Sequence, residues 1–346
     1  MATPLFSRAS GFGPLFAIVQ AELGGEALAR LRRESGFAPA TFSPSTLVPF
    51  PVMNRVYNFA ADLCGDRQFG ARVGLTIRAE DFGPFVEFAL CGGTLGAVIA
   101  RANAAQSLHS SDVDLDLRVI GDEARWRVRY RAKSEPTVEH HAQRSLMQML
   151  GTVSRFAGSR KEGIEIHVAE PYAEGAKLLE DRLDIRVRPR AGDYEIAFPM
   201  SLLGCATPLA GLPPGLLDEA AAAYQDRPLP RAMAEAVLIA LQLREDLPRA
   251  GIGNIASEFG LPARTLQHAL KTEGVSYRDI VLRLRMRRAR QLLATTESAL
   301  GEIALRTGYA NPANFHRAFT LHSGMTPGRF RAAMRRPLRN SRKLSS

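Results

Sequence analysis

The sequence predicts an α+β domain followed by an all-α domain, and three observations support this prediction. The chain has 346 residues, which is too long for one ordinary core, so two domains are expected. Residues 1–226 mix helical apolar spacing with alternating strand patterns, whereas the segment after about residue 230 has helical spacing. Charge divides the chain as well. Residues 227–346 hold 21 Lys and Arg against 8 Asp and Glu, a net charge of +13, while residues 1–226 hold 24 against 27, a net charge of −3.

This uneven charge indicates a polyanion as the partner of the C-terminal third. Nucleic acid and an anionic membrane surface both fit, and charge alone also leaves open a solvated basic face. No apolar run approaches the roughly 20 residues of a membrane span, and the first residues lack a secretory signal pattern. The three cysteines, Cys64, Cys91 and Cys205, lie far apart without any Cys-x-x-Cys. We therefore expect a cytoplasmic protein with no membrane partner.

Residues 1–210 are expected to form the α+β domain. Its first helices are predicted in "GPLFAIVQAELGGEALARLRRESG", broken at Gly24 and Gly25, and in a segment that starts near Pro51. The stretch "TLGAVIARANAAQSLH" predicts a helix that Thr94 opens. Strict alternation in "DVDLDLRVIGDEARWRVRYRA" then predicts a β-hairpin that turns at residues 121–122.

The hairpin register predicts one apolar and one charged face. The apolar face pairs Val113, Leu115 and Leu117 with Tyr130, Val128 and Trp126. The charged face places Asp112, Asp114 and Asp116 opposite Arg131, Arg129 and Arg127. Cross-strand ion pairs explain this arginine row better than an anion site does. Trp126 is likewise expected in the core.

A helix in "PTVEHHAQRSLMQMLGTVSRFAG", strands in "GIEIHVAE", "DIRVRP" and "DYEIAFP", and a helix in "AEGAKLLEDRL" complete the α+β pattern. The adjacent His140 and His141 point apart on a helix, so a solvated pair is expected and a metal site is not. His141 and Arg144 share a face, however, and could meet an anionic ligand. Three helical arginines could serve such a ligand too, although helical arginines more often face solvent; they are Arg30, Arg32 and Arg33.

The C-terminal part is expected to begin after a connector. Residues 211–229 are rich in Pro and Gly around an alanine-rich helix, with a boundary near Asp226, and residues 230–335 follow as a separate domain. Residues 336–346 lack periodicity and are expected to be a disordered basic tail that adds non-specific attraction to DNA.

The stretch from residue 300 to residue 331 predicts a helix-turn-helix. The segment "LGEIALRTG" predicts the first helix, and Gly308 allows the sharp turn after it. Asn311 can cap the second helix, and Pro312 suits its first position. The packed side of the first helix is expected to include Ile303, Ala304 and Leu305. The packed face of the second helix is expected to include Phe315, Ala318, Phe319 and His322.

The same spacing occurs about 48 residues upstream, in "IASEFGLPARTLQHALKTEGVSYRDI". The offset between the two copies drifts from 48 to 50. Between them, residues 276–296 predict an arginine-rich helix that would span about 31 Å at 1.5 Å per residue. This length is close to the ~34 Å between successive major grooves on one face of DNA. Two such motifs, one groove repeat apart, predict a DNA-binding protein.

Residues 230 to about 335 resemble the double helix-turn-helix domain of AraC/XylS-type bacterial transcription regulators. The most specific part of the resemblance is "IALRTGYANPANFHRAFTLHSGMTPGRFR". The first copy departs from the family pattern, because Pro262 stands where a Ser cap is usual and His268 where Arg is common.

The resemblance implies DNA-binding positions in both motifs. In the first motif they are Arg264, Gln267, His268 and Lys271, and in the second they are Ala313, Asn314 and Arg317. Arg and Gln suit guanine and adenine edges, whereas Ala313 offers little hydrogen bonding, so looser discrimination is expected in the second groove. For Arg317, a salt bridge or phosphate contact is as plausible as base reading. Phosphate contacts are expected from Arg278, Arg329 and Arg331, near helix starts.

Residues 14 to 210 resemble the N-terminal sensing domain on one branch of these regulators, the arabinose-binding-like domain. This implies a small-molecule effector of unknown identity, with an anionic compound such as a cyclic dinucleotide among the possibilities, and no cofactor. Together the resemblances imply a ligand-responsive activator that binds double-stranded promoter DNA, contacts RNA polymerase and forms a homodimer through the N-terminal half.

Two other classes of protein share parts of this pattern. A DNA-repair or modification enzyme can carry the same DNA-binding domain, but it would need clustered cysteines, which this chain lacks. A ligand-independent architectural DNA-binding protein would be basic throughout, whereas the first 226 residues carry a net charge of −3. We therefore expect a regulator and not an enzyme.

Overall fold

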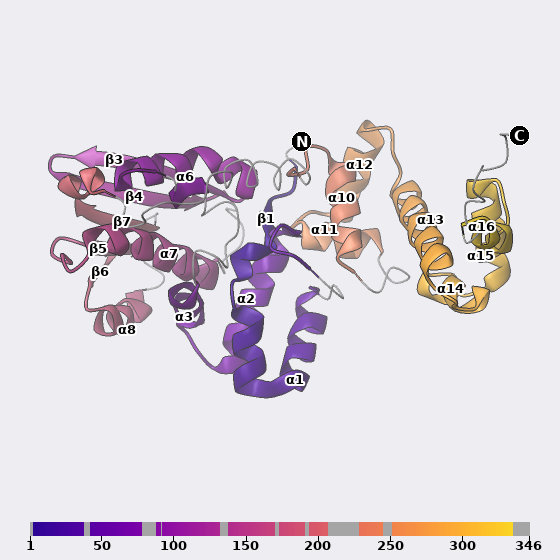
Figure 1. The fold of residues 1–346 in the computed structure, drawn as a ribbon, viewed down its shortest axis with the longest axis horizontal. Coiled ribbons are helices and arrows are strands. Elements are labelled where there is room, and N and C mark those ends of the chain that lie inside the picture. Colours follow the sequence, from indigo (N-terminus) through magenta and orange to yellow (C-terminus); the bar gives the residue numbers. More distant parts are fainter. Residues whose placement is uncertain are drawn as a thin grey trace, which may run out of the picture. The chain divides into compact units, whose positions relative to one another are not determined.

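The structure, a computed structural model, describes residues 3–37, 42–77, 88–90, 92–131, 138–169, 173–190, 194–206, 228–244 and 251–334 (Figure 1). Contacts divide the chain into two compact units. One comprises residues 2–231 with 258–260, and the other residues 232–257 with 261–346. Most of the expected connector 211–229, including the boundary near Asp226, and the whole expected tail 336–346 lie outside the described residues. Each unit is described by itself below.

The N-terminal unit begins with a short two-stranded sheet and helices. Strand β1 (Phe6–Arg8) pairs antiparallel with β2 (Leu47–Pro49), and a 3-10 turn at Ala9–Phe12 follows β1. Helix α1 (Leu15–Ser35) kinks at Gly24, whose φ of 80° confirms the predicted break there. Helix α2 (Phe50–Cys64) starts one residue before the predicted Pro51, and α3 (Phe69–Thr76) comes next.

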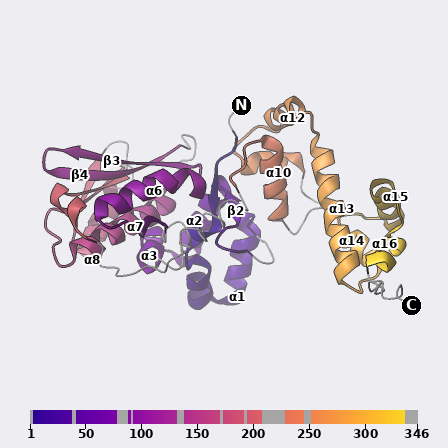
Figure 2. The same ribbon diagram turned by 45° about the horizontal axis from the view of Figure 1, so that its top comes forward.

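A helix and a hairpin follow at the predicted places. The hydroxyl of Thr94 accepts a hydrogen bond from the Ala97 amide at 3.3 Å, which caps α6 (Leu95–His109). Strands β3 (Val113–Ile120) and β4 (Glu123–Tyr130) are joined by a two-residue turn. Figure 2 shows this hairpin with α6 beside it. Leu115 pairs with Val128, and Leu117 with Trp126, so the predicted register is confirmed.

The rest of the unit extends the hairpin into a five-stranded sheet of order β3-β4-β7-β5-β6. Its remaining elements are α7 (Glu139–Ala157), β5 (Glu165–Ala169), α8 (Ala173–Leu183), β6 (Arg186–Arg190), β7 (Tyr194–Pro199) and a 3-10 turn at Met200–Gly204. Strands β5 and β6 run parallel, joined through α8, and the other pairs are antiparallel. The predicted α+β architecture of this unit is confirmed.

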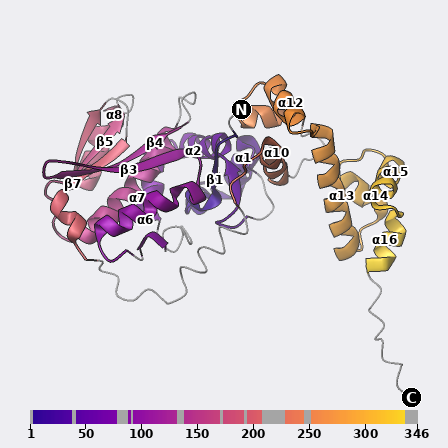
Figure 3. The same ribbon diagram turned by 90° about the horizontal axis from the view of Figure 1, so that it is seen from above.

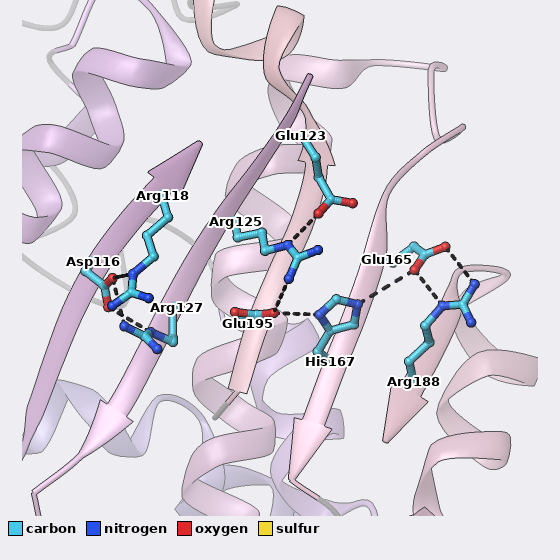
Figure 4. A network of polar contacts seen from close by, with 9 residues as sticks. All are labelled: Asp116, Arg118, Glu123, Arg125, Arg127, Glu165, His167, Arg188 and Glu195. Carbon is cyan, nitrogen blue, oxygen red and sulfur yellow. Dashed lines mark hydrogen bonds and ion pairs between the residues drawn. The ribbon is translucent and has the colours of Figure 1, made fainter. Parts of the chain in front are cut away.

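The two faces of the sheet differ in polarity. Trp126, Ile166 and Ile196 are buried in one core with apolar side chains of α6 and α7. Alternation sends their neighbours to the other face, where charged and polar side chains form two groups of contacts that together include residues of all five strands (Figure 4). There His167 Nδ1 lies 2.7 Å from Glu195 Oε1, and Arg188 Nε lies 2.7 Å from Glu165 Oε2.

The predicted cross-strand pairing of the arginine row is confirmed in part. Arg127 Nε lies 2.9 Å from Asp116 Oδ1, as predicted. Arg131, however, pairs with Asp114 at 2.9 Å and not with Asp112, whose side chain is fully buried. The prediction for Asp112 was wrong because this residue precedes β3 and turns inward.

The C-terminal unit is entirely helical among the described residues. It contains α10 (Met233–Gln242), α11 (Ile252–Glu258), α12 (Ala263–Thr272), α13 (Tyr277–Thr295), α14 (Leu300–Arg306), α15 (Pro312–Ser323) and α16 (Pro327–Met334). Figure 3 shows α14, α15 and α16 gathered beside the second half of α13. The predicted all-α architecture is confirmed here.

Two clusters of contacts hold this unit together. Helix α10 packs against α12 and α13, and the carboxylate of Glu273 accepts the amides of Met233 at 2.7 Å and Ala234 at 2.9 Å. A second core joins Met286, Leu293, Ile303, Phe315 and Phe319. Two predicted members of its packed faces were placed wrongly. Leu305 is 61% exposed and His322 is also exposed, because each lies at the edge of a short amphipathic face.

Candidate DNA-binding helices and a buried cavity

Helix α12 is the second helix of the first motif. It buries Leu266, Ala269 and Leu270 and leaves its other face in solvent. That exposed face carries all four residues predicted to bind DNA in this motif, Arg264, Gln267, His268 and Lys271. Pro262 occupies the N-cap position without a side-chain cap, so the helix starts from a fixed proline φ instead of a serine hydroxyl.

Helix α15 is the equivalent helix of the second motif. Asn311 caps it by accepting a hydrogen bond from the Ala313 amide at 2.7 Å, as predicted. Phe315 and Phe319 are buried, while the predicted DNA-binding residues Ala313, Asn314 and Arg317 are all exposed. Arg317 Nη2 donates to Asn314 Oδ1 at 2.6 Å, so these two side chains form one polar group on the exposed face.

The turns of the two motifs share a backbone geometry. The Leu261 amide donates to the Ala256 carbonyl at 2.8 Å, and the Tyr309 amide donates to the Ala304 carbonyl at 2.9 Å. Both pairs are related by the same offset of 48 residues. Gly260 and Gly308 have φ values of 65° and 88°, in the left-handed region that favours glycine. The internal repeat seen in the sequence is therefore a structural repeat.

Helix α13 is continuous between the two motifs. Ser276 and Asp279 form a reciprocal capping box at its start. The 19 helical residues correspond to about 28 Å at 1.5 Å per residue. Its arginines are of two kinds. Arg283 and Arg287 are exposed, whereas Arg285, Arg288 and Arg290 are half-buried.

The three arginines expected near phosphates lie in different surroundings. Arg278 is exposed in the first turn of α13, and Arg329 is exposed in α16. Arg331 is half-buried, and its Nη2 donates to the Ser298 carbonyl at 2.5 Å. Arg331 therefore fastens α16 to the segment before α14, a structural contact that the sequence pattern did not indicate.

In the N-terminal unit, three of the five candidate ligand-binding residues lie on α1. Arg30 pairs with Glu34 at 3.0 Å and lies 5.5 Å from the ring centre of Phe59. Arg32 lies over the ring of Phe16 at 5.6 Å, and Arg33 is exposed. The other two candidates, His141 and Arg144, are buried on α7. The structure therefore does not bring the five together.

His141 and Arg144 line a cavity of about 100 Å³ between α6, α7 and the hairpin. One water molecule needs roughly 10–15 Å³ by the same kind of measure, so there is room for a small organic molecule. The apolar wall comprises Ala89, Leu90, Val98, Ala102, Val113, Leu115, Trp126, Val128 and Met149. The polar residues of the lining are Ser7, Gln106, His109, Ser110, Asp112, His141, Arg144, Ser145, Gln148 and Thr152.

A directed chain of hydrogen bonds orders the α7 side of this cavity. Arg144 Nη2 lies 2.6 Å from His141 Nε2, and since a guanidinium only donates, Nε2 accepts. The proton of this imidazole is then on Nδ1, 3.1 Å from the Tyr130 hydroxyl. Tyr130 in turn reaches Ser145 at 3.0 Å, and Ser145 donates to the His141 carbonyl. Burial and the nearby Arg144 lower the pKa of His141 well below its ordinary value, which keeps the ring neutral.

Asp112 is the unusual member of the cavity wall. It is fully buried, and neither carboxylate oxygen has a hydrogen-bond partner among the described residues. Burial raises its pKa from 3.8 to about 6, although weaker interactions with the Ser110 side chain and with its own backbone, and the charges of Arg144 and Arg131, oppose that rise. The neighbouring Ser110 hydroxyl accepts the Gln106 amide at 2.6 Å. Burial, with Arg144 and Arg8, lowers the pKa of His109, so this ring adds no positive charge beside the carboxylate.

Sequence reasoning missed the cavity in two ways. It treated Asp112 as part of a surface charge row, and it expected His140 and His141 to be solvated. His141 is 3% exposed, so that expectation was wrong for this residue. Alternation would place Asp112 on the face opposite Val113 and Leu115 if β3 included it, but Asp112 precedes β3, so the alternation does not fix its direction.

The described part of the chain contains no cluster of three or more His, Cys, Asp or Glu side chains that could hold a metal ion. None of its helices is long and apolar enough to cross a membrane.

Two segments match sequence models of known families. Residues 255–333 match a helix-turn-helix domain, and residues 25–207 match a domain described as the arabinose-binding domain of AraC transcription regulator, N-terminal. The second match alone covers more than half of the chain, and the two matches together cover parts of both structural units.

Known relatives are transcription regulators. The chain is 25% identical over 307 residues to the ornithine utilization regulator of Pseudomonas aeruginosa, covering 84% of this chain and 86% of that protein. It is 30% identical over 89 residues to the HTH-type transcriptional activator CfaD of Escherichia coli, covering 25% of this chain and 34% of CfaD. Among solved structures, the transcriptional regulator CdpR of Pseudomonas aeruginosa aligns over 89% of this chain and 97% of CdpR, with 19% identity and a TM-score of 0.40.

Proposed function

The chain belongs to the AraC family of transcription regulators, and from this premise we propose that it is a ligand-responsive, sequence-specific transcriptional activator. Its two helix-turn-helix motifs read two successive major grooves of promoter DNA. The observation that carries this proposal is the pair of exposed polar faces on α12 and α15. Each lies opposite a buried apolar face, and the continuous α13 joins the two motifs.

The roles of the exposed residues follow from their chemistry. Arg264 and Gln267 can each make two hydrogen bonds to a base edge, Arg to guanine and Gln to adenine. His268 and Lys271 lie on the same exposed face. In the second motif Asn314 and Arg317 are bonded to each other, so they present a combined donor and acceptor group to the groove. Arg278 and Arg329 are placed for phosphates, which position the protein without reading sequence. Arg331 is less suited to bind a phosphate, because its Nη2 already donates a hydrogen bond to the Ser298 carbonyl.

The spacing of the motifs supports reading of two grooves. The helical part of α13 corresponds to about 28 Å, near the ~34 Å of one DNA turn, and further residues of each motif add to the separation. A single chain would then cover about two turns, or roughly 20 base pairs, on one face of the duplex.

The N-terminal unit is proposed to bind the effector and to hold the homodimer interface. The cavity next to Asp112 supports an effector site. Its lining combines one guanidinium with a buried carboxylate, which fits a small molecule better than a doubly anionic cyclic dinucleotide. The name of one relative links that protein to the utilization of ornithine, an amino acid, and a small metabolite of this kind suits the cavity. Activation in the cytoplasm, through contact with RNA polymerase, completes the proposal.

The test is selection of preferred sites from random duplexes by the full-length chain, followed by footprinting. We expect a protected region of about 20 base pairs with two preferred segments centred about 10.5 base pairs apart. Arg264→Ala should weaken the sequence preference in one segment, and Arg317→Ala should weaken it in the other. Glu302→Ala, on the exposed side of α14, serves as the control and should leave both intact. Selection of a single segment, or of none, would contradict reading of two grooves.

The dimer is tested separately by light scattering on the full-length chain. We expect a mass of about twice the 37.8 kDa of one chain. A monomer at micromolar concentrations, with or without DNA, would remove the homodimer from the proposal and leave the DNA contacts untouched.

A further inference from the structure

We infer that the cavity between α6, α7 and the β3–β4 hairpin binds a small molecule carrying a primary ammonium group, with Asp112 as the residue that holds the ammonium and the apolar wall enclosing a short aliphatic body. This inference rests on the proposed function in one respect, since it treats the cavity as the effector site. It goes further by assigning the ligand class and the residue that selects it.

The first step is that Asp112 lacks a partner that the fold could easily have provided. Buried carboxylates are usually paired or hydrogen-bonded, because burial of an uncompensated charge is costly. Here the side chain is fully buried and both of its oxygens have no hydrogen-bond partner among the described residues. Nearby arginines have other partners. Arg131 pairs with Asp114, and Arg8 donates to the carbonyls of Leu108 and Ser45.

The second step is that the polar side chains on the α7 side of the cavity form hydrogen bonds with one another and not with Asp112. Arg144, His141, Tyr130 and Ser145 are linked in this order by hydrogen bonds, and Ser145 also donates to the His141 carbonyl. Arg144 Nη1 also donates to Gln148 at 2.6 Å. The guanidinium is thus held on α7 and is not bonded to Asp112, although both line the same cavity. The carboxylate of Asp112 can therefore accept hydrogen bonds from a ligand in the cavity.

The third step concerns the ligand itself. An ammonium group supplies three hydrogen-bond donors and one positive charge. It would therefore both hydrogen-bond to the Asp112 carboxylate and neutralise its charge. The cavity lining also includes Val98, Leu115 and Trp126, which suit methylene groups. Trp126 is fixed there by its indole N–H, which donates to Asn103 at 3.0 Å. A small aliphatic amine or an amino acid has this composition, and in the latter case Arg144 is the group that can receive the carboxylate.

The experiment is calorimetric titration of the full-length chain with three groups of compounds. The first group is amino acids (L-ornithine, L-lysine and L-norvaline), the second is amines without a carboxylate (putrescine and butylamine), and the third is pentanoate, which has no amine. We expect binding from the first or second group and none from pentanoate. Binding of amino acids alone would show that Arg144 receives their carboxylate, whereas binding of both groups would show that the ammonium suffices; either result supports the inference.

Three variants make the test specific. Asp112→Asn keeps the shape and removes the charge, so affinity for the amine that binds should fall at least tenfold. Asp114→Asn is the matched control, since this carboxylate is two residues away and pairs with Arg131 in solvent. It should bind as the wild type does. Ala102→Leu fills the cavity while keeping Asp112, and it should also abolish binding. Melting curves confirm that each variant is folded.

The results separate this inference from the proposed function. Failure of every amine to bind, binding of pentanoate alone, or unchanged affinity in Asp112→Asn would overturn the inference, and gel shifts without any ligand would still report on DNA reading. An amine that binds through Asp112 but leaves DNA affinity and transcription unchanged would support the inference and contradict the ligand-responsive part of the proposed function.

Discussion

The guanidinium of Arg285 lies over the ring of Tyr309, 5.3 Å from its centre. Arg285 belongs to α13, and Tyr309 belongs to the turn between the two helices of the second motif. The pair therefore fastens that turn to the long helix by a cation–π contact, which is worth about 0.5–1 kcal/mol at a partly exposed site. Gly308 lies beside it, and a Cβ atom there would be 3.1 Å from Arg285 Nε.

Gly308→Ala is expected to destabilise the C-terminal unit by about 1–3 kcal/mol. Its φ of 88° strains any residue with a Cβ, and the added methyl group also crowds Arg285. Urea unfolding followed by circular dichroism measures the loss. Gly274→Ala is the matched control, because its φ is 71° and nothing lies within 4 Å of the added atom. Equal losses in the two variants would show that the Arg285 contact contributes nothing.

Glu273→Gln is expected to cost about 1 kcal/mol of stability in the same unit. The carboxylate of Glu273 accepts two amides at the first turn of α10, where a negative charge is also favoured by the helix dipole. Thermal melts of both proteins provide the measurement. Glu302→Gln removes a carboxylate that only meets the exposed Arg306 at 3.7 Å, so its effect should be a few tenths of a kcal/mol. A larger loss in that control would contradict the capping role.

The contribution of Asp112 to the stability of the N-terminal unit should fall as pH rises from about 4 to about 6. Burial raises the pKa of Asp112 to about 6, against the opposing charges of Arg144 and Arg131, so the folded state keeps a proton that the unfolded state has released. By linkage the fall is up to about 3 kcal/mol, at ~1.4 kcal/mol per pKa unit. Asp112→Asn should remove this dependence, measured as the difference between the two melting temperatures at each pH. Asp114 behaves oppositely, because Arg131 lowers its pKa, and so it stabilises above its ordinary pKa. A wild-type advantage that grows with pH would contradict the prediction for Asp112.

Arg264→Ala and Arg329→Ala should weaken DNA binding in different ways. Loss of Arg264 should cost about 1–3 kcal/mol on the preferred site and relax selection at one or two base pairs. Loss of Arg329 should weaken binding to all sequences alike and make the salt dependence shallower by about one unit. Titrations of preferred and random duplexes over a range of salt concentrations measure both effects. The reverse assignment would mean that α12 and α16 are oriented differently on the DNA.

The elements of the fold were largely predictable, because local patterns determine them. The alternation around residues 121–122 predicted the hairpin register, and Thr94 and Asn311 predicted where α6 and α15 start. Gly308 predicted the sharp turn of the second motif, where its φ is positive. The residues predicted to bind DNA on α12 and α15 are all exposed in the structure. These predictions needed only neighbours in the chain.

The cavity was not predictable in the same way, because contacts between distant segments create it. Asp112 lines the cavity together with residues of β1, β4 and α7, which lie far from it in the chain. The same holds for Arg331, whose bond to Ser298 joins residues 33 apart. The alternation of charged and apolar residues predicts which side chains share a face within a strand, but it does not predict at which residue the strand starts. Sequence patterns therefore predicted the Arg127–Asp116 pair correctly and missed the burial of the Asp112 side chain.

Helix α13 contributes to two cores, since it packs against α10 and also supplies Met286, Ala289, Leu292 and Leu293 to the core with α14 and α15. Insertion of one residue between the two halves would turn the second motif by about 100° around the helix axis and move it by about 1.5 Å. Four inserted residues would nearly restore the rotation while lengthening the separation by about 6 Å. Under the proposed reading of two successive grooves, the number of residues in this helix sets both the distance and the rotation between the two DNA sites that the chain binds.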